Sequence, residues 1–116
     1  MAQDRPHAHE LLAAIRDFLA TDVAPKLDGR TGFQVKVAIN SLAILEREAT
    51  LGPAADAREL ARLKALLGRD APLPDLNAEL ARRLRAGERD ETDAALMEHL
   101  RLTIADKIAI SNPKWR

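Results

Sequence analysis

The chain has 116 residues whose eighteen basic and eighteen acidic side chains cancel, so it lacks the net charge that attracts a protein to nucleic acid or anionic lipid. Its length fits a single domain over residues 1–116, and the absence of cysteine excludes disulfides and thiolate metal sites. Alanine, leucine, glutamate and arginine are frequent and aromatic residues make up only 3%, which favours helices over strands.

Caps and apolar spacing predict about five helices and no strand. Asp4 can cap the first helix, whose first turn contains Pro6, and Asp75 can cap the fourth. Gly52 and Pro53 together form a strong stop signal after the second helix. The expected helices cover approximately residues 6–25, 31–51, 54–67, 76–86 and 93–110, and the two prolines within residues 69–74 predict a loop there.

The second helix is apolar on two sides. At 100° per residue, Phe33, Val37, Ile44 and Leu51 fall on one side, and Val35, Ala38, Ile39, Leu42, Leu45 and Ala49 fall on nearly the opposite side. A helix with two apolar sides packs between neighbours. We therefore expect an all-α, single-domain bundle with the second helix at its centre.

The chain lacks the apolar segments that direct a protein to a membrane. Its longest apolar runs span only a few residues, far below the roughly 20 that cross a bilayer. The opening residues, Met1–Pro6, contain no apolar signal core. We therefore expect a cytoplasmic protein without a membrane partner.

No catalytic template fits the chain. His7, His9 and Glu10 do not reproduce the spacing of a helical zinc site, and the five glycines lie singly at helix ends instead of forming a phosphate-binding loop. His99 lies inside the fifth helix, where a lone histidine is usually a boundary residue that makes one hydrogen bond. We therefore expect no enzyme activity, no metal and no cofactor.

Several polar residues interrupt the apolar faces, and these are the candidate site residues. Lys36, Asn40 and Arg47 form a strip along the second helix, Glu48 borders one of its apolar sides, and Lys107 lies within the apolar arc of the fifth helix. Because a buried charge needs a partner, these residues are candidates for a buried polar network. The strip can also be a set of structural ion pairs, a pocket for an anion or carboxylate, or a partner-facing surface.

A basic run occupies the end of the fourth helix. Arg82, Arg83 and Arg85 lie close together, with Arg89 beyond Gly87. The helix dipole favours cations at this end, and no aromatic residue is interleaved to stack on bases. We therefore expect no nucleic-acid partner for this run.

Stretches along most of the chain carry a resemblance. They are Asp4–Pro6 with Glu10–Leu12, Gly29–Phe33, Asn40–Glu48, Leu76–Leu80, and Asp106–Lys107 with Asn112–Trp115. Together they resemble a bacterial family of small helical proteins classed as a domain of unknown function. Such proteins are often encoded beside acyl-CoA dehydrogenases and kinases similar to aminoglycoside phosphotransferases, which implies an accessory role in acyl-CoA metabolism. The resemblance assigns no role to any residue.

The leading hypothesis is a helical interaction module that binds a partner enzyme or a second copy of itself through an apolar helix face. The alternative is a small-molecule binding protein for an acyl-CoA, a carboxylate or a phosphate, which would use Lys36, Asn40 and Arg47. A third hypothesis, an enzyme that uses Lys107 or His99, requires a buried reactive group.

Overall fold

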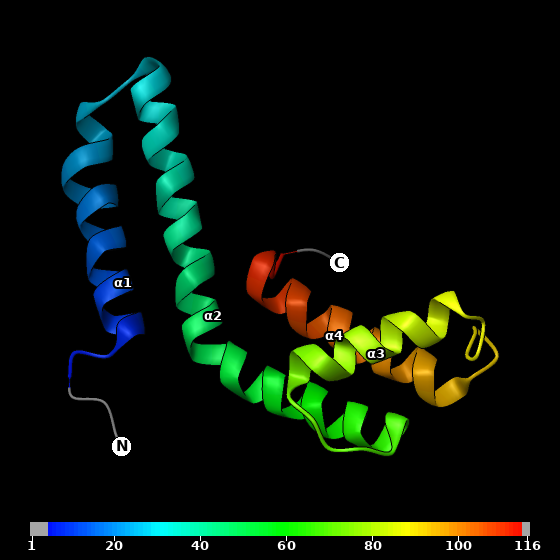
Figure 1. The fold of residues 1–116 in the computed structure, drawn as a ribbon. Coiled ribbons are helices and arrows are strands. Elements are labelled where there is room, and N and C mark those ends of the chain that lie inside the picture. The colour runs from blue at the N-terminus through cyan, green and yellow to red at the C-terminus, as the bar shows by residue number, and fades with distance from the viewer. Residues whose placement is uncertain (1–4, 115–116) are drawn as a thin grey trace. The chain divides into compact units, whose positions relative to one another are not determined.

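The computed structural model describes residues 5–114, and every regular element in that range is helical (Figure 1). α1 covers Ala8–Phe18 and continues through a π-helical turn, η1, at Leu19–Val23 and a 3₁₀ turn, η2, at Ala24–Lys26. α2 covers Gly29–Leu67, α3 covers Leu73–Arg85 and α4 covers Ala94–Ser111. The all-α class is confirmed, with four α-helices among the described residues instead of about five. None of these helices has both the length and the apolar character of a membrane span.

α2 is one helix of 39 residues, although the sequence predicted two helices separated at Gly52 and Pro53. Proline lacks the N–H that would donate to the carbonyl of Ala49, so the helix loses one hydrogen bond there. Most residues that follow, from Ala54 onward, are good helix formers, and the helix continues. The predicted boundary is wrong because the loss of one backbone bond did not outweigh the helical preference on both sides.

Two helix starts differ from the predicted caps. α1 begins directly after His7, whose backbone N–H donates to Oε1 of Glu10 at 3.1 Å, and not near Asp4, which lies outside the described residues. α3 begins one residue before Pro74, so the loop ends earlier than predicted and Asp75 lies in the first turn. A proline at this point removes no hydrogen bond, because the first N–H groups of a helix have no partner within it.

The described residues form two compact units, and α2 contributes to both. The second unit, residues 53–109, contains a hydrophobic core from α2, α3 and α4. Its buried members are Leu63, Leu67, Leu76, Leu80 and Leu96. Leu76, Leu80 and Leu84 repeat every fourth residue, which predicts one apolar side for this helix. Leu76 and Leu80 are buried, whereas Leu84 is 36% exposed. That residues 1–116 form a single domain stays a prediction.

The first unit contains residues 5–52 and 110–114 of the described range. In it α1 lies beside the first part of α2 (Figure 1), and Arg16 donates two hydrogen bonds across the pair to Glu46. No apolar side chain of this unit is buried within the described residues. A large aromatic residue near the end of a chain usually packs on the body, but Trp115 lies outside the described range.

The two apolar sides of α2 differ in burial within the first unit. Val35, Ile39 and Leu42 on one side are partly buried. On the other side, Phe33 remains 66% exposed and Val37 50% exposed. The expectation that neighbours cover both sides is therefore wrong for Phe33 and Val37, whereas Ile44 on their side is partly buried and Leu45 on the other side is 46% exposed.

Candidate functional site

Two of the predicted site residues, Asn40 and Arg47, line one cleft in the first unit. They lie seven residues apart, so two helical turns place them on the same side of α2. The cleft has a volume of about 460 Å³ and is lined by Asn40, Arg47, Ser111, Asn112, Pro113 and Lys114. We call it the Arg47 cleft. The sequence prediction found the part on α2 and missed the part that follows α4.

Arg47 is held in place by the end of α4. Its Nε–H donates a hydrogen bond of 2.7 Å to the backbone carbonyl of Ile110. The last carbonyls of a helix have no partner within it, so Arg47 caps α4 from the side.

The described lining of the Arg47 cleft contains positive charge and no carboxylate. Among these residues Arg47 and Lys114 are charged, and the others are neutral. Glu46 is next to Arg47 along the chain, but Arg16 binds both of its carboxylate oxygens. The hydrogen bonds from Arg16 are the main reason that the pKa of Glu46 is lowered, against the opposing effect of burial, and Arg47 adds a smaller electrostatic contribution.

The other predicted site residues lie outside this cleft. Lys36 is exposed one turn before Asn40 on α2, and Glu48 is exposed after Arg47. Lys107 is exposed on α4 in the second unit and has an electrostatic or hydrogen-bonding interaction of its own. Apolar residues occur around most of α4, so its apolar arc did not mark the buried side. These three residues are exposed, as is Asn40 in the cleft, so the four do not form the buried network that the sequence suggested. A role for them in ligand binding stays a prediction.

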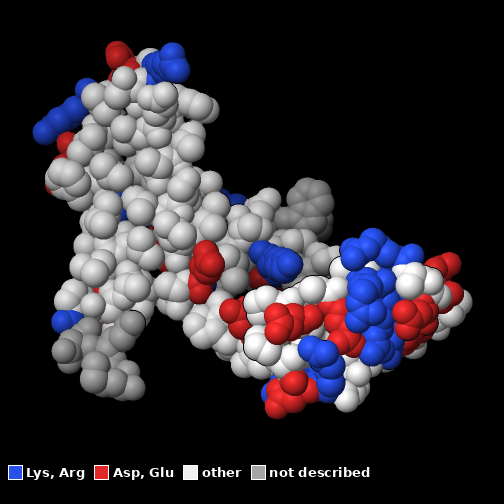
Figure 2. All heavy atoms as spheres, viewed as in Figure 1, with Lys and Arg blue, Asp and Glu red and all other residues white. Residues whose placement is uncertain are grey.

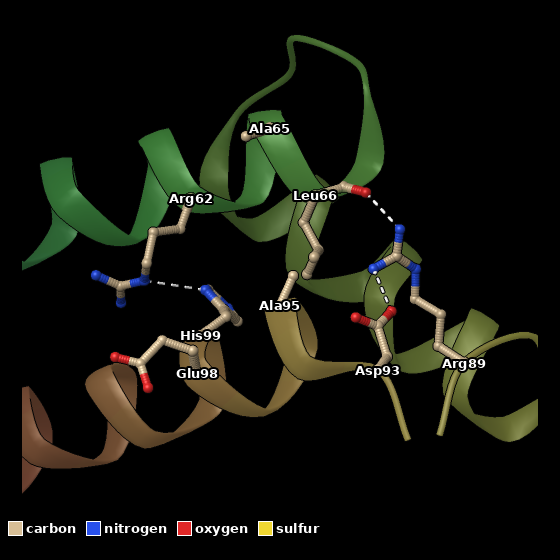
Figure 3. A pocket seen from close by; sticks show the side chains of 8 residues that line it. All are labelled: Arg62, Ala65, Leu66, Arg89, Asp93, Ala95, Glu98 and His99. Atoms are coloured by element: carbon tan, nitrogen blue, oxygen red, sulfur yellow. Dashed lines mark hydrogen bonds and ion pairs between the residues drawn. The ribbon is translucent and has the colours of Figure 1, made fainter. Parts of the chain in front are cut away.

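A second pocket lies within the second unit (Figure 3). Its volume is about 490 Å³, and its lining consists of Arg62, Ala65, Leu66, Arg89, Asp93, Ala95, Glu98 and His99. Figure 3 shows apolar residues between a polar group around Arg62 and another around Arg89. The sequence singled out His99, and Arg89 only as part of the basic run, but it missed Arg62.

His99 is buried, with 4% of its surface exposed, and its Nδ1 accepts a hydrogen bond of 3.1 Å from Nε of Arg62. Arg62 also donates from Nη2 to Oγ1 of Thr103 at 3.0 Å. Burial, and then the charge of Arg62, lowers the pKa of His99, while Glu59 acts in the opposite direction. Because Nδ1 is an acceptor, the neutral ring carries its proton on Nε2. Arg62 thus occupies the lone pair that this tautomer would use as a general base.

The polar group around Arg89 connects three segments of the second unit. Arg89 donates from Nη1 to Oδ2 of Asp93 at 3.0 Å and from Nη2 to the carbonyl of Leu66 at 2.6 Å. Oδ1 of Asp93 accepts the backbone N–H of Leu96 at 3.0 Å, so Asp93 caps the start of α4. These bonds hold the wall of the pocket in place, and the polar atoms that form them are not available to a ligand.

The basic run on α3 makes two kinds of contact. Arg83 lies 2.6 Å from Oε2 of Glu79, without hydrogen-bond alignment, and Arg69 lies 3.1 Å from Oε1. Glu79 is only 7% exposed, so the two arginines compensate a buried carboxylate. Arg82 and Arg85 line a third cleft of about 460 Å³ together with Arg69. Carboxylates also line that cleft and offset its positive charge.

The histidines near the N-terminus lie close to each other. The rings of His7 and His9 stack, with centroids 5.8 Å apart. Within residues 5–114, no group of three or more His, Cys, Asp or Glu side chains is arranged to hold a metal ion.

Comparison with known proteins identifies one family. The model of the family described as "Domain of unknown function (DUF6285)" matches residues 25–115. The match includes every lining residue of the Arg47 cleft, whereas the opening part of the resemblance, Asp4–Leu12, lies outside it. No curated protein and no solved structure matches the chain. Because the match covers most of the chain, the protein belongs to the DUF6285 family, a domain of unknown function.

Proposed function

We propose that this protein is a helical accessory module that associates with a second copy of itself through apolar surfaces of its first unit. The observation that carries the proposal is the lack of any buried apolar side chain among the described residues of that unit. Two helices cannot enclose a core by themselves, so a helical hairpin needs a further element over its apolar surface.

One such surface lies on α1. Leu11, Ile15 and Phe18 are 51%, 49% and 56% exposed. Their spacing of four and then three residues places them on one face of the helix, which we call the α1 face. Arg16 lies on the side that contacts α2, through its hydrogen bonds to Glu46. The α1 face is therefore distinct from the contact between the two helices.

A second surface lies on α2. Phe33, Val37 and Leu51 are 66%, 50% and 44% exposed, and they belong to the same predicted apolar side of the helix. We call it the α2 face. On the side of the molecule seen in Figure 2, charged residues crowd the surface over α3, whereas the described surface over α1 and the first part of α2 carries few.

A second copy of the chain is the occupant that these faces fit best. Half-exposed side chains of this size together leave on the order of 500 Å² of apolar surface uncovered, which approaches the roughly 800 Å² per partner of a standard interface. Two hairpins that cover each other form a four-helix bundle, a common arrangement for such elements. Two-fold dimers are also the commonest oligomers. An accessory role in acyl-CoA metabolism rests on the resemblance alone.

Analytical ultracentrifugation of the full chain over a wide concentration range tests the proposal. We expect a reversible dimer. Phe18→Glu on the α1 face and Phe33→Glu on the α2 face each introduce a charge into the interface, so at least one of them raises the dimer dissociation constant by about tenfold or more.

The matched control is Ile104→Glu, because Ile104 is a similarly exposed apolar residue, at 55%, but lies on α4 in the second unit. It should leave the dissociation constant unchanged, and circular dichroism should show the same helix content for all variants. A wild-type chain that stays monomeric at near-millimolar concentration contradicts self-association and leaves a partner enzyme as the occupant of these faces.

A further inference from the structure

We propose that the Arg47 cleft binds the phosphate or carboxylate group of a small molecule. This inference is independent of self-association, because none of the lining residues belongs to the α1 face or the α2 face. The argument depends on the donors that the cleft presents, on its charge and on its size.

The guanidinium of Arg47 is fixed before any ligand arrives. Its Nε–H donates to the carbonyl of Ile110 at 2.7 Å, a bond that does not use the terminal edge of the fork. Two parallel N–H groups on this edge match two oxygens of a phosphate or carboxylate. A donor that is already held in position loses less conformational freedom on binding.

Further donors surround this fork. Asn40 lies on the same side of α2, and Asn112 and Lys114 follow α4. Each asparagine amide supplies N–H donors, and the lysine ammonium supplies a charged donor that can rotate. An oxoanion accepts several hydrogen bonds from different directions, and this cleft offers them from two separate segments.

The charge of the cleft also fits an anion. Partly buried arginines are normally paired with a carboxylate. Arg47 is partly buried, yet its one hydrogen-bond acceptor among the described residues is a neutral carbonyl. The neighbouring Glu46 is held by Arg16 on the side of α1. An anionic ligand would add a counter-charge within the cleft.

One feature of the fold opposes an anion at this place. The C-terminal end of α4 points its last carbonyls toward this region and carries roughly half a negative charge from the helix dipole. The Ile110 carbonyl already accepts a hydrogen bond from the positively charged Arg47, which offsets its partial negative charge. The full positive charges of Arg47 and Lys114 therefore exceed the helix contribution.

The size of the cleft restricts the ligand to a small molecule. Its volume of about 460 Å³ lies within the usual range of roughly 300–1,000 Å³ for small-ligand sites. It accommodates one oxoanion group together with part of the molecule that carries it.

Nuclear magnetic resonance of the ¹⁵N-labelled full chain tests the proposal. Inorganic phosphate and sodium acetate are titrated separately at constant ionic strength, with sodium chloride as the reference salt. We expect saturable shifts of the Arg47 Nε–H signal and of the side-chain amides of Asn40 and Asn112. Tighter binding of phosphate identifies a phosphate ligand, and tighter binding of acetate identifies a carboxylate.

Lysine variants separate the site from general attraction of anions. Lys114→Gln removes a charged donor from the cleft, so it should weaken binding by about tenfold. Lys36→Gln is the matched control, since Lys36 is also exposed but does not line the cleft. It should leave binding unchanged. Arg47→Gln should abolish binding, but Lys114→Gln is the sharper test because Arg47 also caps α4.

The proposal is overturned if neither phosphate nor acetate gives saturable shifts at these three residues. It is equally overturned if Lys36→Gln weakens binding as much as Lys114→Gln, because the attraction would then come from the general surface charge.

Discussion

Arg62 on α2 donates a hydrogen bond of 3.1 Å from Nε to Nδ1 of His99 on α4, a residue 37 positions later in the chain. The bond requires a neutral imidazole, because a protonated ring has no free lone pair at Nδ1. Burial, and then the charge of Arg62, also disfavour the protonated ring and lower the pKa of His99. The protonation state of His99 is thus coupled to the packing of α2 against α4.

Stability should fall in mildly acidic solution because of His99. An unfolded histidine takes up a proton below about pH 6.5, whereas the folded His99, with its lowered pKa, stays neutral. The unfolded state then binds more protons than the folded state, so the free energy of unfolding decreases as the pH falls below about 6.5, by at most about 1.4 kcal/mol per pH unit. The decrease ends once the folded ring is protonated too.

Urea unfolding from about pH 5 to about pH 8 measures this effect. His99→Gln should remove the part of the pH dependence that belongs to the histidine. The matched control, His9→Gln, changes an exposed histidine and should keep the wild-type dependence. The same pH dependence in wild type and His99→Gln would contradict the assignment.

Glu79→Gln should destabilise the second unit by about 1 kcal/mol. Glu79 is buried between Arg69 and Arg83, and the uncharged amide leaves both arginines without their counter-charge. The free energy of unfolding from urea titration gives the effect, and Glu88→Gln, at an exposed residue, should have almost none. Equal stability of the two variants would show that the ion pairs contribute nothing.

The sequence alone was sufficient where burial follows local spacing. Of the leucines that repeat every fourth residue on α3, Leu76 and Leu80 are buried and Leu84 is 36% exposed. The pattern did not reveal that Phe33 and Val37 on α2 stay exposed, because spacing shows which residues share a face and not whether a neighbour covers that face.

The same limit applies to the candidate site. Helical spacing placed Asn40 and Arg47 on one strip, and the structure shows both in one cleft. The hydrogen-bond partner of Arg47 is the backbone carbonyl of Ile110, 63 residues away. A backbone acceptor has no side-chain signature, and the contact depends on how far α4 extends. No reading of the residue types could have found it.

Leu63→Ala should destabilise the second unit by about 2–5 kcal/mol, since it opens a cavity at a fully buried position. Leu63 is 0% exposed and belongs to the core with Leu76 and Leu96. Thermal unfolding followed by circular dichroism measures the loss. Met97→Ala, at a residue that is 44% exposed, is the control and should cost far less.

Gly52→Ala and Gly68→Ala should change the free energy of unfolding in opposite directions. Gly52 lies inside α2, and Gly68 directly follows it. A Cβ at Gly52 would meet only Cγ of Glu48, at an ordinary 3.6 Å. Alanine restricts the unfolded chain and should stabilise the protein by about 0.5–1 kcal/mol. Gly68 ends the helix at a φ of 69°, a conformation that strains any side chain, so alanine should cost about 1 kcal/mol.

Urea unfolding gives the change in the free energy of unfolding of each variant relative to wild type, and the sign of each change is the result to compare. If Gly52→Ala destabilises the chain, α2 is not a continuous helix through Gly52 and Pro53 in solution, and the boundary that the sequence predicted is real. If Gly68→Ala has no effect, the left-handed turn that ends α2 is absent. The opposite signs are expected only when the helix passes through Gly52 and stops at Gly68, as the structure has it.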